Sequence, residues 1–179
     1  MRKKFLTAVV AGTLMAVGLA APAHAEETTV TLNVAAAGGL TITVPASVSL
    51  GTGVGGTTVS GQLGPVTVID QRASLTPNWT ATVIATDFTT GGGTPAETIP
   101  NINITYWSGG ATATAGSGTF TPGQASAGDA VIINVPRTAF SHTGGTANNF
   151  ATWNPTVAVA IPADAVVGVY TGTVTHSVL

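Results

Sequence analysis

Short runs of alternating residues recur along this chain, and they constrain its fold more than any other feature. In residues 79–85 (WTATVIA) and 40–44 (LTITV), apolar side chains occupy every second position, with mostly threonine between them. Residues two apart point to the same face of an extended strand, so each run builds one apolar and one mostly polar face. This period is typical of half-buried antiparallel strands. No apolar stripe of period 3.6 follows residue 25, so we expect an all-β fold with almost no helix beyond that residue.

Turn residues separate these runs from one another. We expect strands within residues 30–34, 40–44, 66–69, 79–85, 102–106, 131–135, 157–161 and 167–178. The Gly/Ser/Thr-rich stretches 90–100 and 108–128 are interpreted as loops or irregular hairpins. About eight to ten strands with regular turns favour a single antiparallel β-sandwich, Ig-like in architecture, over residues 26–179. A division into two domains at 110–128 is the alternative, but each half is small for a stable core.

The first 25 residues have the organisation of a secretory signal peptide. Three basic residues stand at positions 2–4, an uncharged apolar run follows at 5–19, and Ala-His-Ala at 23–25 supplies the small residues that signal peptidase recognises. We therefore predict a helical signal peptide over residues 1–25 and a secreted protein. A retained membrane anchor is the alternative interpretation. No later run reaches the ~18 apolar residues of a membrane span, so we expect no transmembrane anchor after cleavage.

The charge of the chain beyond residue 25 excludes one class of partner. Arg72 and Arg137 face seven carboxylates there, and the chain has no lysine beyond position 4, so the formal net charge of this part is −5. Two arginines cannot neutralise a run of phosphates, so we expect no nucleic-acid partner. A polyanionic wall polymer is a poor partner for the same reason.

Residues that support catalysis are sparse. The chain contains no cysteine, which excludes disulfides, thiol chemistry and cysteine-ligated metals. It contains neither a Gly-x-Ser-x-Gly nor a His-Glu-x-x-His motif, and no two carboxylates have the arrangement of a glycosidase pair. We therefore predict a protein that is not an enzyme and has no cofactor or metal site.

Two parts of the chain resemble the WxL domain of Gram-positive surface proteins. That family has an alternating strand ending in Asp-x-Arg, a second strand opening with Trp-Thr-x-Thr-Val, and a C-terminal strand of the form Gly-x-Tyr-Thr-x-Thr-x-Thr-Trp-x-Leu. Here residues 66–72 read VTVIDQR, residues 79–83 read WTATV, and residues 168–178 read GVYTGTVTHSV. The two Trp-x-Leu motifs stand as Trp-Thr-Ala and His-Ser-Val, so the chain resembles a divergent WxL domain. The resemblance implies non-covalent association with peptidoglycan or another cell-wall glycan.

Three candidate ligand-binding residues come from the strand pattern in these segments. Trp79 shares a strand face with Ala81, and Tyr170 shares one with His176 on the last strand. If the two strands are neighbours, Trp79 and Tyr170 frame a shallow aromatic surface suited to stacking on sugar rings. The alternative is that Trp79 and Tyr170 pack in the sandwich core and that His176 is a neutral, hydrogen-bonded histidine.

Asp70 and Arg72 complete the set of candidate ligand-binding residues. They lie two apart at a strand end, so both side chains can project to one side and contact a ligand. The alternative is an ion pair or an Asx-type cap that stabilises the turn. Of the two tryptophans outside these segments, the pattern favours exposure for Trp107 and a core position for Trp153.

Two non-enzymatic functions remain open from the sequence. The first is a wall-binding module that associates non-covalently with peptidoglycan or another cell-wall glycan. The second is a structural surface protein that pairs with copies of itself or with other envelope proteins through β-strand contacts.

Overall fold

The structure is a computed structural model, and it describes residues 31–33, 35 and 38–179. The signal peptide predicted for residues 1–25 lies outside these described residues. The chain divides into two units, Met1–Asn33 and Val34–Leu179. Of the first unit the structure describes only residues 31–33, which belong to no helix or strand. All the candidate site residues lie in the second unit.

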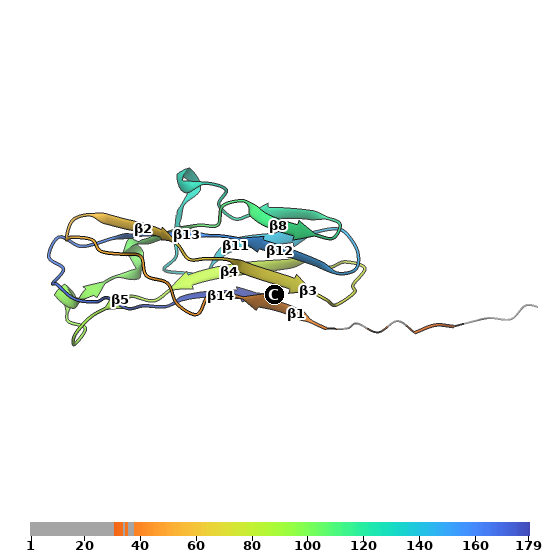
Figure 1. Cartoon of the computed structure of the whole chain (residues 1–179), viewed down its shortest axis with the longest axis horizontal. Helices are drawn as coiled ribbons and strands as arrows, with labels where there is room; N and C mark the ends of the chain where they lie inside the picture. The colour runs from red at the N-terminus through yellow and green to blue at the C-terminus, as the bar shows by residue number, and fades with distance from the viewer. Residues whose placement is uncertain (1–30, 34, 36–37) are drawn as a thin grey trace, which may run out of the picture. The chain divides into compact units, whose positions relative to one another are not determined.

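Strands make up nearly all the regular structure of the second unit (Figure 1). In chain order they are β1 (Leu40–Thr43), β2 (Thr58–Gln62), β3 (Val66–Asp70), β4 (Trp79–Ala85), β5 (Phe88–Thr89), β6 (Thr98–Ile99), β7 (Ile104–Trp107), β8 (Ala111–Ala115), β9 (Thr119–Pro122), β10 (Val131–Ile132), β11 (Arg137–Thr143), β12 (Asn149–Trp153), β13 (Thr156–Ala160) and β14 (Val174–Val178). The helical segments are three single 3-10 turns, η1 (Pro95–Glu97), η2 (Asn101–Asn103) and η3 (Ala127–Asp129). Among the described residues, no helix has the length and apolar character needed to cross a membrane.

The strands form two facing layers, and all their pairings are antiparallel. One layer contains the sheets β1-β3-β12-β8 and β10-β7-β13-β2, and the other is the sheet β14-β4-β11-β9. The first two sheets are continuous. β2 directly precedes β3 in the chain and β13 directly follows β12, and β2 pairs with β13 just as β3 pairs with β12. Pro65 and Pro155 separate the two ladders, since a proline has no N–H to donate.

Aromatic side chains join the two layers in the core. Trp153 of β12 stacks on Phe140 of β11 with ring centroids 4.8 Å apart, and Tyr106 of β7 lies 5.6 Å from His176 of β14. The inward positions of β4 are all buried, as its alternation predicts. The all-β antiparallel sandwich expected from the sequence is therefore confirmed, and so is the core position of Trp153.

The strand that carries Trp79 and the C-terminal strand are neighbours, which was the condition set in the sequence analysis for a shared aromatic surface. β14 pairs with β4 in the register Val174↔Ala85 to Val178↔Ala81, and the two strands lie side by side in Figure 1. Main-chain hydrogen bonds between Thr80 and Leu179 extend this ladder by one more residue. Valine and histidine side chains of β14 point inward and its Thr and Ser residues point outward.

The expected long strand over residues 167–178 is wrong in its first half. Only Val174–Val178 forms a strand, and residues 166–173 are irregular apart from one bridge between Thr171 and Thr89. The alternation of this segment is strand-like, but no neighbouring strand pairs with the main chain of residues 167–170. Without such a partner the segment lies along the edge of the sandwich without forming a ladder.

Several other expected strand boundaries also change. Ile102 belongs to η2, β10 ends at Ile132, and Leu32 lies outside any strand, whereas Val30 and Val34 are not among the described residues. The stretch interpreted as loops or irregular hairpins contains β8 and β9. All five residues of β8 are exposed, so its sequence (ATATA) carries no apolar signal that reveals a strand.

Candidate functional site

Trp79 lies in the core and offers no surface to a ligand. Only 2% of the residue is exposed, and its indole Nε1 donates a hydrogen bond to the side-chain Oδ1 of Asn149, 2.8 Å away. The ring packs against Phe140 and His142 of the neighbouring strand β11. A buried tryptophan with a satisfied N–H is a packing residue. The alternative of a core position, open at the sequence level, therefore describes Trp79.

Tyr170 is far from Trp79, so the aromatic surface expected between them does not form. Thr171 pairs with Thr89, which lies ten residues along the chain from Trp79, or roughly 30 Å of extended strand. The Tyr170 hydroxyl shares its one proton between the carbonyl oxygens of Ala96 and Val166, at 3.1 and 2.9 Å. These bonds hold the half-buried ring against the irregular segment that precedes β14.

Asp70 and Arg72 form an ion pair that holds the turn between β3 and β4. Arg72 donates from Nε and from a terminal guanidinium nitrogen to the two carboxylate oxygens of Asp70, at 2.9 and 2.8 Å. The same terminal nitrogen also donates to the main-chain oxygen of Asn78, directly before β4. The Asp70 carboxyl is fully buried, and the hydrogen bonds from Arg72 hold its pKa below the usual range. The pair thus has the structural role that the sequence left open as its alternative.

His176 is the end of a hydrogen-bond chain that crosses the core. Trp153 Nε1 donates to the hydroxyl oxygen of Tyr106, and that hydroxyl lies 3.2 Å from Nε2 of His176. Because an indole N–H can only donate, Tyr106 accepts from Trp153 and has its own proton free for His176. This direction requires an unprotonated Nε2. Burial lowers the pKa of His176 to about 4 and raises that of the Tyr106 hydroxyl, so both groups are neutral at pH 7.

The shifted pKa of His176 predicts a loss of stability in mild acid. An unfolded histidine takes up a proton near pH 6.5, whereas His176 in the folded protein does so only near pH 4. Between these values the unfolded chain binds more protons, so the free energy of unfolding falls as the pH drops from about 6.5 to about 4. The expected decrease in the free energy of unfolding over this whole pH range is about 3 kcal/mol.

NMR titration of the imidazole signals measures the pKa of His176 directly. Urea unfolding of wild type and His176→Gln at several pH values measures the effect of this pKa on stability. The difference between the two proteins isolates His176 from His142, the other histidine among the described residues. A His176 signal that titrates near pH 6.5 would contradict the expected burial.

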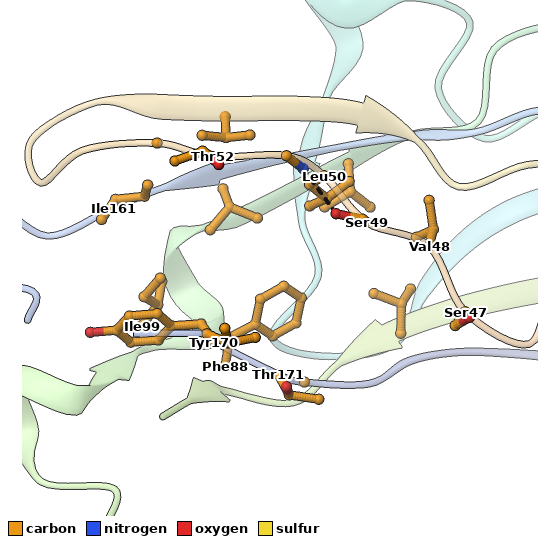
Figure 2. Close-up of a pocket in the computed structure, with 18 of the residues that line it drawn as sticks. Ser47, Val48, Ser49, Leu50, Thr52, Phe88, Ile99, Ile161, Tyr170 and Thr171 are labelled. Carbon is orange, nitrogen blue, oxygen red and sulfur yellow. Dashed lines mark hydrogen bonds between the residues drawn. The ribbon is translucent and has the colours of Figure 1, made fainter. Parts of the chain in front are cut away.

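A cleft of about 920 Å³ lies at the edge of the sandwich. One wall consists of inward side chains of the β2–β3 and β13 region, including Val59, Leu63 and Val157. Figure 2 shows Leu50 and Ile161 on one side of the space and the rings of Phe88 and Tyr170 on the other. His176 also lines the cleft, whose lining contains no Asp, Glu, Lys or Arg side chain.

Two irregular segments, 44–55 and 165–173, form the rims of the cleft. Within the described unit, residues 44–53 make no main-chain to main-chain hydrogen bond, and residues 167–170 make none either. Their N–H and C=O groups are therefore available to water or to another strand. The rims thus present two unpaired edges on either side of an apolar space.

Exposed apolar side chains concentrate on the same rims. Of the thirteen large hydrophobic residues that are exposed in the described part of the chain, six lie in these two segments: Val44, Val48, Val54, Val166, Val167 and Val169. Exposed apolar side chains that gather at the rims of one cleft mark an interaction site more often than scattered single residues do. The cleft and its rims are therefore the candidate functional site.

Sequence reasoning singled out Tyr170 and His176 of this site but missed the cleft itself. Its rims carry several valines, as a strand would. Only the structure shows that the main chain of the rims has no strand to pair with. Among the described residues, no group of three or more His, Cys, Asp and Glu side chains is placed to hold a metal ion. The chain matches no protein-family model, no curated protein and no solved structure at a significant level.

Proposed function

We propose that this protein is an exported, non-catalytic component of a Gram-positive cell surface that binds an extended segment of a protein in the cleft. The unpaired rims carry the proposal. A protein strand fits both features of the site, because its inward side chains fill the apolar space while its main chain pairs with the rims. A small apolar ligand fills a space of this volume equally well, but it leaves the main-chain groups of the rims to water.

The surface location rests on the sequence. The first 25 residues have the pattern of a signal peptide, and the chain resembles the WxL family of surface proteins at residues 66–83 and 168–178. An uncharged apolar site also suits a role in strand pairing better than a role in binding charged substrates.

Association with peptidoglycan or another cell-wall glycan is the second candidate, and the neighbouring positions of β4 and β14 favour it. These strands carry the two segments on which the WxL resemblance depends. With Trp79 in the core, the partly exposed residues Tyr170 and Arg72 are the candidates for glycan contact. This candidate needs no occupant in the cleft.

Strand binding predicts protection of the rims from hydrogen exchange. With a synthetic heptapeptide of alternating threonine and valine, we expect main-chain exchange in residues 44–50 and 167–170 to slow by about tenfold or more, because new strand pairing occupies these amides. Val169→Glu is expected to abolish the protection, since it places a charge at an apolar rim. Val169 is 85% exposed, so this change leaves the fold intact.

Leu75→Glu is the matched control, because Leu75 is 83% exposed in the β3–β4 connection and does not line the cleft. This variant should retain the protection. Unchanged exchange in wild type would overturn the strand-binding proposal. If the same protein then sediments with purified sacculi, wall-glycan association becomes the supported function.

A further inference from the structure

We infer that the strand bound in the cleft is residues 28–34 (TTVTLNV) of a second copy of this chain. This inference rests on the proposed function, because it names the occupant of the same cleft. Residues 28–33 belong to the first unit and the cleft to the second, so each copy carries both a donor and an acceptor.

The chemistry of the segment fits the cleft. Val30, Leu32 and Val34 alternate with polar residues, so an extended conformation gathers the three apolar side chains on one face. The segment carries no charge, and neither does the lining of the cleft at neutral pH. Leu32 is 86% exposed and belongs to no strand of the described structure. Burial of this leucine in the cleft of a partner removes apolar surface from water on both sides.

The length of the segment also fits. Seven extended residues span about 23 Å. The wall of the cleft follows the chain from Val59 through Leu63 to Val66, which is seven residue steps. On the rim, residues 44–50 precede Gly51, whose φ of +90° interrupts the extended path. The stretch of unpaired rim between β1 and Gly51 therefore also contains seven residues, with a bend at Ala46.

The direction of β1 favours a second copy over the same copy. Leu40 pairs with Asp70 and Thr43 with Thr67, so β1 runs towards the cleft from its far end. A five-residue turn over 35–39 would place Leu32 level with Ile42 and Val30 level with Val44. The apolar residues would then lie along β1 and reach only the mouth of the cleft. A segment from another molecule enters without this restriction.

Donor and acceptor are different surfaces, so the contact is head-to-tail and leaves a free donor and a free acceptor at the ends of each chain of molecules. Wild-type protein is therefore expected to form open, concentration-dependent assemblies. A variant that lacks one of the two surfaces can only terminate such an assembly.

Sedimentation velocity of the secreted protein with two variants tests this inference. Leu32→Glu removes the donor, Val169→Glu removes the acceptor, and each variant alone is expected to lose self-association by about tenfold or more. An equimolar mixture of the two is expected to form dimers and nothing larger, since one intact donor meets one intact acceptor. Leu75→Glu is the matched control and should assemble as wild type does.

Two results would overturn the inference. One is a wild-type protein that stays monomeric, whether or not residues 44–50 are protected from exchange. The other is a mixture of Leu32→Glu and Val169→Glu that forms no dimer although wild type assembles. If the threonine–valine peptide still protects the rims in either case, the strand-binding function stands and the occupant comes from another protein.

Discussion

Replacing Trp153 by alanine is expected to lower the free energy of unfolding by about 4 kcal/mol. Trp153 is fully buried at the centre of the sandwich, where its ring stacks on Phe140 and its N–H donates to Tyr106. The alanine variant leaves a cavity between the two layers. It also removes the hydrogen bond that the Trp153 N–H donates to the Tyr106 hydroxyl. Domains of this size are stable by about 5–15 kcal/mol, so this one change removes a large share of the total.

Two further variants separate packing from hydrogen bonding in this effect. Trp153→Phe keeps a ring on Phe140 and loses the N–H, so we expect a loss of about 1–2 kcal/mol. Tyr106→Phe leaves the Trp153 N–H and the His176 Nε2 without partners, and the expected loss is about 1–3 kcal/mol. Urea unfolding followed by tryptophan fluorescence or circular dichroism measures all three. Ser177→Ala, on the exposed face of β14, is the control and should stay within about 0.5 kcal/mol of wild type.

A loss of less than about 1 kcal/mol in Trp153→Ala would contradict the central position of this ring. The same experiment tests the hydrogen-bond chain, because a shift of the His176 titration in Tyr106→Phe is expected only if the hydroxyl contacts Nε2. A purely structural role for Tyr106 would change stability without moving that titration.

The parts of the fold that could be predicted from the sequence are those in which periodicity coincides with burial. β4 is the clearest example, because its inward residues are Trp79 and three small or branched apolar residues, and its outward residues include two threonines. β3 and β13 follow the same rule. In these strands one face is buried, so the sequence pattern and the structure respond to the same physical cause.

Strands without a buried face escaped prediction for the same reason. β8 is exposed at all of its residues, and β2 buries no residue fully, so their sequences resemble those of loops. β12 begins with Asn149, whose side chain is buried and accepts a hydrogen bond from Trp79. A buried asparagine makes sense only once its partner, 70 positions away, is known.

The candidate site illustrates a different limit. Val167 and Val169 have the spacing of a strand, and the sequence predicted a strand that begins at residue 167. Periodicity records which side chains share a face, but it contains no information on whether a neighbouring main chain is present to pair. The unpaired rims of the cleft are therefore a property of the tertiary structure alone. Likewise the strand pattern placed Trp79 and Tyr170 on neighbouring strands but did not fix their separation along them.

Replacing Arg72 by alanine is expected to lower the free energy of unfolding by about 2–3 kcal/mol at pH 7. The variant leaves the fully buried Asp70 carboxylate without its two guanidinium hydrogen bonds and releases the start of β4 at Asn78. Breaking a fully buried pair costs about 3–5 kcal/mol, and the 37% exposure of the Arg72 side chain places the expected value below that range.

The pH dependence of the Arg72→Ala variant distinguishes this ion pair from an ordinary surface pair. In wild type the hydrogen bonds from Arg72 lower the pKa of Asp70, so the pair stabilises the fold above about pH 4 and loses this effect as the pH falls through the folded pKa. In the variant the main-chain N–H of residue 72 still donates to Asp70, but the guanidinium hydrogen bonds and charge are lost, so the pKa of the buried carboxyl rises relative to wild type. The stability difference between wild type and variant is therefore expected to be largest at neutral pH and to narrow towards pH 4.

The double variant Asp70→Asn/Arg72→Ala provides the decisive comparison, because it removes the unpaired charge while keeping the shape of the buried side chain. It is expected to recover about 1 kcal/mol or more relative to Arg72→Ala at pH 7, and to show little dependence on pH in this range. Urea unfolding of the four proteins of the cycle at pH 4 and pH 7 gives the coupling energy. A loss below about 0.5 kcal/mol in Arg72→Ala, equal at both pH values, would show that Asp70 reaches water in solution. The turn between β3 and β4 would then owe its conformation to two other hydrogen bonds, from the N–H of Ala73 to the side chain of Asn148 and from the N–H of Gly144 to the side chain of Asn78, and not to the ion pair.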